Sequence, residues 1–174
     1  MKQKVSEDLR KYLESENQIG KILPSCPDIE ELWKKLATSY LPDGIREFQK
    51  YPVSSLGWMM FIGMAVATFW DGDWNIYSQI DDLYLYMRNK RGYDSLDDYI
   101  KEEVLLLNEK EAQNTNRLVG ECASRTNNML RHAHIEPGTK EAFKAYTDCL
   151  ELLYYFGAAI QLHRMGYQMV KSEG

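Results

Sequence analysis

The sequence lacks the short motifs that identify the common enzyme classes. It contains no Gly-x-x-x-x-Gly-Lys-Ser/Thr loop, no Gly-x-Gly-x-x-Gly, no Gly-x-Ser-x-Gly and no His-Glu-x-x-His. No glutamate is followed three residues later by a histidine, which is the spacing that binds paired iron in helix bundles. We therefore expect no metal ion and no cofactor, and we favour a non-catalytic function over an enzyme.

Cysteine is scarce, and positive charge is not in excess. The three cysteines, Cys26, Cys122 and Cys149, have no paired spacing, and the first eleven residues are largely polar, unlike a secretion signal. We therefore expect reduced, buried thiols and a cytoplasmic protein. The formal net charge of −5 argues against nucleic acid as the main partner, because binding to phosphates needs a basic face.

Long apolar runs are absent with one exception, the segment LGWMMFIGMAVATFW from Leu56 to Trp70. As a helix it would be about 22 Å long, which is short of the roughly 30 Å hydrocarbon core of a bilayer. Two acidic residues, Asp71 and Asp73, follow it directly, and Gly57 and Gly63 lower its helix propensity. A segment that is apolar on all sides must be covered by other elements, so it predicts the central helix of a bundle rather than a membrane span.

Helical periodicity dominates the rest of the chain, and no segment alternates as a strand would. We predict one all-α domain over residues 1–174, a bundle of five to six helices around a central apolar helix at about 55–70. The first helix, about 4–19, is expected to pack at the periphery. The other expected helices are one from Asp28 to a proline-glycine turn at 41–45, one over 73–90 capped by Asp73, one or two within 95–133, and one over 140–171 capped by Thr139.

The most distinctive local pattern follows the apolar segment, where Trp70, Asp71, Asp73 and Trp74 surround a glycine and Tyr77 lies one turn further. Two carboxylates beside two indoles could bind a cation or an amine through charge and ring faces. The same residues also suit a tight corner between helices, with Asp73 as an N-cap. We favour the corner and retain these five residues as candidate ligand-binding residues.

A second candidate position is His163, which borders the apolar stripe of the last helix and precedes Arg164. A single histidine at such a position is more often a hydrogen-bonded residue at the core edge than a catalytic group. We retain His163 and Arg164 as candidate ligand-binding residues without assigning a reaction.

Two functions remain open at this stage. The first is a non-catalytic helical module that binds a protein partner or a second copy of itself, because Tyr, Trp and Met are abundant and suit interfaces. The second is a small-molecule-binding protein or hydrolase-like enzyme, with a pocket between helices near Asp71 and Asp73 or near His163. We favour the first.

Overall fold

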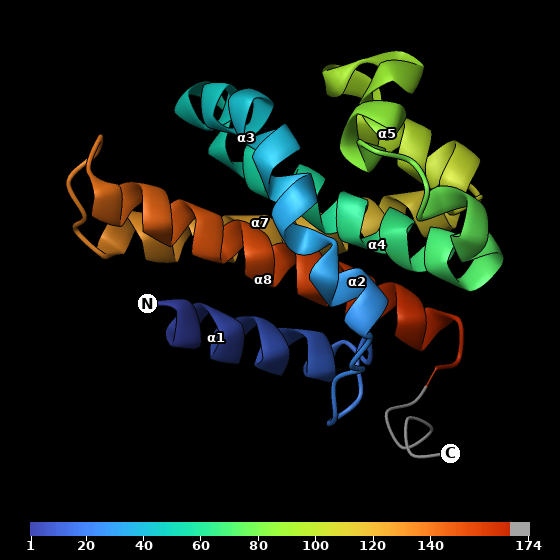
Figure 1. Cartoon of the computed structure of the whole chain (residues 1–174). Helices are drawn as coiled ribbons and strands as arrows, with labels where there is room; N and C mark the ends of the chain where they lie inside the picture. Colours follow the sequence, from blue (N-terminus) through green and yellow to red (C-terminus); the bar gives the residue numbers. More distant parts are fainter. Residues whose placement is uncertain (168–174) are drawn as a thin grey trace.

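The computed structural model of the chain describes residues 1–167, and Figure 1 shows the arrangement of its helices. Within these residues there are eight α-helices, one 3-10 helix (η1), one π-helix (η2) and no strand. The predicted all-α fold is confirmed, with more helices than the expected five to six because two predicted helices are divided. The elements are α1 (Lys2–Ser15), α2 (Pro27–Glu31), α3 (Trp33–Lys50), α4 (Pro52–Tyr77), α5 (Leu83–Arg91), η1 (Tyr93–Ser95), α6 (Leu96–Tyr99), η2 (Ile100–Val104), α7 (Glu109–His132) and α8 (Lys140–Arg164).

The predicted central helix is confirmed as the core of α4. This helix packs against α8 along most of its length and also against α7 and α3, so that it is covered on most sides. By length and composition α4 could cross a membrane, but 72% of its most apolar 18-residue stretch is buried inside the fold. The segment is therefore apolar because it is surrounded by other helices.

A pair of glycines sets the distance between α4 and α8. A methyl group added at Gly63 would overlap the carbonyl oxygen of Tyr154, and one added at Gly157 would overlap the carbonyl oxygen of Met60. Each helix thus presents a glycine to the backbone of the other. Residues without a side chain allow two helices to approach more closely than the usual 8–10 Å between axes.

The first helix lies along α7 and α8, as the lower helix in Figure 1. It buries one stripe, made of Val5, Leu9 and Leu13. Its polar side is tied to α7 by an ion pair between Arg125 and Asp8 at 3.3 Å. Such partly exposed pairs contribute tenths of a kcal/mol each, so the apolar stripe is the main attachment of α1.

The turn predicted at 41–45 is wrong, because α3 runs through it from Trp33 to Lys50 with Pro42 inside the helix. Gly44 is buried at this point, and a methyl group there would lie 2.5 Å from the Tyr40 ring and 2.6 Å from the Tyr146 hydroxyl. The glycine is thus required for close packing and not for a turn. Tertiary packing outweighs the cost of proline in the helix interior.

The predicted helix over 73–90 is wrong as one continuous helix, because helical structure ends at Tyr77 and begins again at Leu83. Asp73 is a non-helical kink (φ −147°, ψ 69°) within α4, which continues to Tyr77. The cap of the next helix is Asp82, whose side chain accepts a hydrogen bond from the Leu85 amide. Aspartate suits both positions, so the sequence alone did not distinguish the kink from the cap.

The segment 95–133 breaks at Asn108, which settles the question that the sequence left open. Asn108 and Glu111 form a reciprocal capping box at the start of α7. The last helix begins after Thr139 as expected, because the Thr139 hydroxyl accepts a hydrogen bond from the Ala142 amide. It ends at Arg164, earlier than the expected 171, which lies outside the described residues.

Candidate functional site

Two adjoining hollows form an apolar groove at the end of the bundle where the α7–α8 loop lies, on the left of Figure 1. Their volumes are about 400 Å³ and 280 Å³, and both are lined by Phe48, Pro137, Ala142 and Tyr146. The first extends to α3 and the start of α8, and the second to the start of α4 and the end of α7. We call the two together the apolar groove.

Exposed apolar side chains gather around the apolar groove. Phe143 is 49% exposed and Ile45 is 37% exposed, and both line the larger hollow. Tyr51 and Val53, which flank the lining residue Pro52 in the chain, are also exposed. Apolar side chains that are exposed singly need no explanation, whereas a contiguous group beside a hollow is typical of a binding surface.

Tyr146 forms the floor of the groove and connects it to a buried polar network. Its hydroxyl lies 2.6 Å from the Ser55 Oγ, which donates a hydrogen bond to the carbonyl oxygen of Gly44 at 2.7 Å. The Ser55 carbonyl oxygen accepts a hydrogen bond from the Tyr40 hydroxyl at 2.5 Å. Burial raises the pKa of Tyr146 and Tyr40 well above the usual value of a tyrosine, so both stay neutral. The floor is therefore hydrogen-bonded to the core and uncharged.

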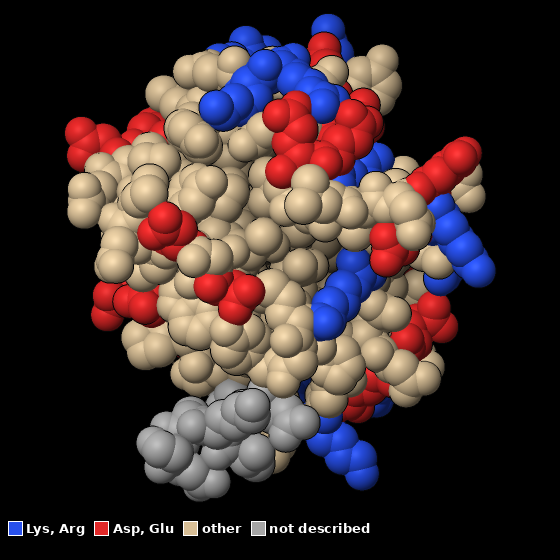
Figure 2. All heavy atoms as spheres, turned by 90° about the vertical axis from the view of Figure 1, so that its right-hand side faces the viewer, with Lys and Arg blue, Asp and Glu red and all other residues tan. Residues whose placement is uncertain are grey.

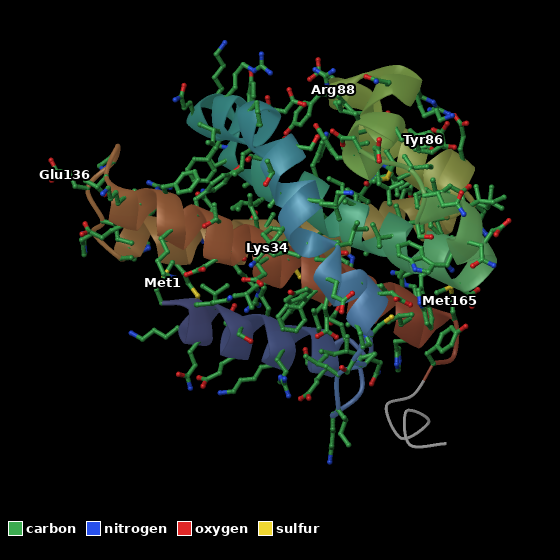
Figure 3. The ribbon with its side chains drawn as sticks, in the orientation of Figure 1. Met1, Lys34, Tyr86, Arg88, Glu136 and Met165 are labelled. Atoms are coloured by element: carbon green, nitrogen blue, oxygen red, sulfur yellow. The ribbon has the colours of Figure 1, made fainter. Side chains whose placement is uncertain are left out.

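A buried carboxylate, Asp43, joins α3 to α5. Its Oδ2 accepts a hydrogen bond from the Tyr84 hydroxyl at 2.6 Å and lies 3.0 Å from Nε of Arg88. Its Oδ1 lies 2.7 Å from a guanidinium nitrogen of Arg46. Arg88 reaches from α5 toward α3 in Figure 3. Since these partners occupy both carboxylate oxygens, the cluster is a structural link between helices.

Lys101 forms a second buried polar cluster, at the π-helix η2. Its side chain is only 7% exposed, and its ammonium donates a hydrogen bond to the Asn116 side chain at 2.7 Å. It lies 3.7 Å from the Asp97 carboxylate and 3.4 Å from that of Asp98. Burial, and next the charge of Asp98, raise the pKa of Asp97, while Lys101 opposes this effect.

Replacing Asp97 with asparagine is expected to stabilise the protein at neutral pH, by roughly 0.5 kcal/mol. Because the folded-state pKa of Asp97 is raised, its carboxyl group favours folding most while it is protonated, below about pH 4, and this contribution is lost as the pH rises through the folded-state pKa. The gain of Asp97→Asn over the wild type should therefore grow between pH 4 and pH 7. Urea unfolding at several pH values measures it, and a gain that shrinks with rising pH would contradict the raised pKa.

A separate hollow of about 210 Å³ lies between α8 and the segment that precedes α2. Its polar groups are already paired: Glu30 accepts hydrogen bonds from the Cys26 amide at 2.8 Å and from the Ser25 hydroxyl at 3.2 Å. The Cys26 thiol is buried, and burial raises its pKa, so it is a poor nucleophile. Burial also raises the pKa of Cys122 and of Cys149 to about 12.

The residues predicted near the end of α4 form a packed corner. The Trp70 indole donates a hydrogen bond to Asp28 of α2 at 3.0 Å, and its ring packs on Tyr167, with 5.3 Å between ring centroids. The Tyr167 hydroxyl donates to the Asp71 carboxylate. Figure 2 shows this end of the molecule, where acidic side chains alone lie on the left and basic side chains lie at the top and on the right. This hydrogen bond thus connects Asp71 of α4 to Tyr167, which follows the end of α8.

The other predicted residues lie around this corner without converging on one of the hollows described above. Asp73 is exposed at the kink, Trp74 is half-buried beside it, and Tyr77 stacks on Phe69 with 4.0 Å between ring centroids. His163 is exposed near the end of α8. The Arg164 guanidinium donates to Thr115 at 3.1 Å and to Gln18 at 3.3 Å, so it ties α8 to α7 and to the segment after α1.

Asn127 and Arg131 of α7 both line the smaller hollow, and neither was predicted as a site residue from the sequence. Their spacing of four residues places them on one helix face, which was the available signal. The helical period of the last helix places Phe143 on its apolar stripe, so its exposure cannot be read from the sequence. The groove is assembled from α3, α4, α7, α8 and the α7–α8 loop, so only the fold reveals it.

The described residues contain no group of three or more His, Cys, Asp or Glu side chains placed to hold a metal ion. The chain matches no protein-family model, and comparison with curated proteins and with solved structures finds no similar protein.

Proposed function

We propose that this chain is a non-catalytic helical protein that binds a protein partner through the apolar groove, in the cytoplasm. The observation that carries the proposal is the group of exposed apolar side chains, Ile45, Tyr51, Val53 and Phe143, in and beside the hollows. Burying such a group stabilises a complex by about 25 cal/mol for each Å² removed from water. Aromatic anchors that enter a pocket are typical of the centre of an interface.

The cytoplasmic setting is supported by the free thiols of Cys26, Cys122 and Cys149, which are buried and not joined in disulfides. The alternative of a hydrolase-like enzyme at Asp71, Asp73 or His163 has less support. Asp71 already accepts a hydrogen bond from Tyr167, and Asp73 and His163 are exposed. None of the three hollows described above is lined by these groups, so they share no position for a substrate there.

The test uses site-specific photocrosslinking in cells. A photoreactive phenylalanine, p-benzoylphenylalanine, is placed at Phe143 in the groove and, as a control, at Ile76, which is 61% exposed on α4 outside the groove. We expect a specific crosslinked product from position 143 that position 76 does not give, and mass spectrometry identifies the partner. If the crosslinked product contains two copies of this chain, the protein is its own partner.

The identified partner is then purified for binding measurements. Ile45→Glu is expected to weaken its binding at least tenfold, because a charge in an apolar contact must be desolvated. Leu85→Glu is the matched control, since Leu85 is 38% exposed on α5 against 37% for Ile45 on α3, and it should change the affinity less than twofold. Equal effects of the two variants, or no position-specific crosslink, would overturn the proposal.

A further inference from the structure

The smaller hollow of the apolar groove combines an apolar wall with two polar side chains from α7. Asn127 and Arg131 lie one helical turn apart on the same face, and both line this hollow beside Leu130 and Ile135. Arg131 is the one charged side chain that lines either hollow within residues 1–167. The polar groups are therefore concentrated at one wall of an otherwise apolar surface.

Asn127 is nine-tenths buried and makes no side-chain hydrogen bond within residues 1–167. It is 9% exposed, and no hydrogen bond joins its side-chain amide to another described residue. The amide is not fully enclosed, because Asn127 lines the hollow and its polar atoms stay accessible there, so a ligand in the hollow can reach them. The polar atoms of the hollow at Cys26, in contrast, already bind one another.

Arg131 is likewise without an acidic partner among residues 1–167. Five other arginines each bind a carboxylate: Arg46, Arg88, Arg91, Arg117 and Arg125. The position of Arg131 in the last turn of α7 is favourable to the helix dipole, which accounts for a positive charge there. It does not account for the Asn127 amide one turn earlier, which is accessible from the same hollow and has no partner among the described residues, so that one ligand can bond to both.

Resting on the proposed function, we propose that the groove recognises a partner segment that carries a carboxylate next to apolar side chains. The carboxylate, from an acidic side chain or a C-terminus, binds the Arg131 guanidinium and accepts a hydrogen bond from the Asn127 amide. The apolar side chains enter the hollow over Tyr146 and Phe48. Arginine presents parallel donors that match a carboxylate, and the apolar wall strengthens the pair by excluding water.

The experiment selects peptides from a displayed random heptapeptide library on the wild-type protein, with counter-selection on Ile45→Glu. We expect the selected peptides to combine apolar or aromatic residues with a carboxylate at a fixed position. Each is then synthesised with that carboxylate and with the corresponding amide. Arg131→Gln should lower the affinity for the carboxylate peptide roughly tenfold. The affinity for the amide peptide should stay within about twofold of the wild-type value. Asn127→Leu should lower the affinity for the carboxylate peptide. Circular dichroism checks that this variant stays folded.

The outcomes separate this inference from the proposed function. If selected peptides compete for the groove but carry no carboxylate, or if Arg131→Gln weakens the acid and amide peptides equally, the carboxylate inference is overturned and the groove remains a binding surface. If no peptide distinguishes the wild type from Ile45→Glu, both are overturned. The matched control is Arg117→Gln, an exposed arginine on the same helix that pairs with Glu16 at 3.3 Å, and it should not change peptide affinity.

Discussion

A Gly157→Ala protein is expected to be about 3 kcal/mol less stable than the wild type. The added methyl group would overlap the carbonyl oxygen of Met60, and backbone atoms cannot rotate away as a side chain can. Relief requires α4 and α8 to separate, which opens gaps along the largest helix contact of the fold. Urea unfolding followed by circular dichroism measures the loss.

Gly120→Ala on α7 is the control for this prediction. A methyl group at Gly120 meets no other atom within 4 Å, so this variant gains helix propensity without a clash. It should be about 0.5–1 kcal/mol more stable than the wild type. If Gly157→Ala were also stabilising, the close approach of α4 to α8 would be wrong.

The second large effect is expected for Asp43→Ala, which should lower the free energy of unfolding by about 2–3 kcal/mol. The substitution removes the acceptor of the buried Tyr84 hydroxyl and leaves the half-buried Arg88 without its carboxylate. Both groups then lose a charge-assisted bond that water cannot fully replace. Thermal or urea unfolding measures the change.

Asp148→Ala is the matched control, because Asp148 also pairs with a basic residue, Lys144, at 2.8 Å within one helix. Lys144 is largely exposed, so the loss should be below about 0.5 kcal/mol. Asp43→Asn should fall between the two, since its amide oxygen can still accept from Tyr84. If Asp43→Ala and Asp148→Ala lowered the free energy of unfolding by similar amounts, the Asp43 cluster would be as solvated as an ion pair on the surface.

The fold class follows from the sequence because the strongest signals were local. The uninterrupted apolar run at 56–70 and the Thr139 cap each depend on neighbouring residues, and the structure confirms both. The turn predicted at Pro42 and Gly44 failed because its decisive contacts come from elsewhere. Gly44 packs against Tyr146, a residue about a hundred positions later, and no local pattern reports such a contact.

The candidate site was less predictable for the same reason. Trp70 and Asp71 were conspicuous in sequence because they are neighbours, and the structure uses them in hydrogen bonds at a corner. The apolar groove draws Phe48 and Phe143 from different helices, and each alone looks like an ordinary member of an apolar stripe. Asn127 is distinctive only because it lines a hollow and makes no hydrogen bond to another described residue, which is a property of the folded state.

The glycine contact between α4 and α8 also has a consequence for the order of events during synthesis. It joins Met60 to Gly157, about a hundred residues apart, so the most apolar helix emerges from the ribosome long before the helix that covers it. In that interval α2, α3 and later α7 can cover only part of it, because the largest contact of α4 is with α8, and α1 packs on α7 and α8. The nascent chain is thus prone to aggregate until α8 is complete, and its folding is concentrated in a late, cooperative step.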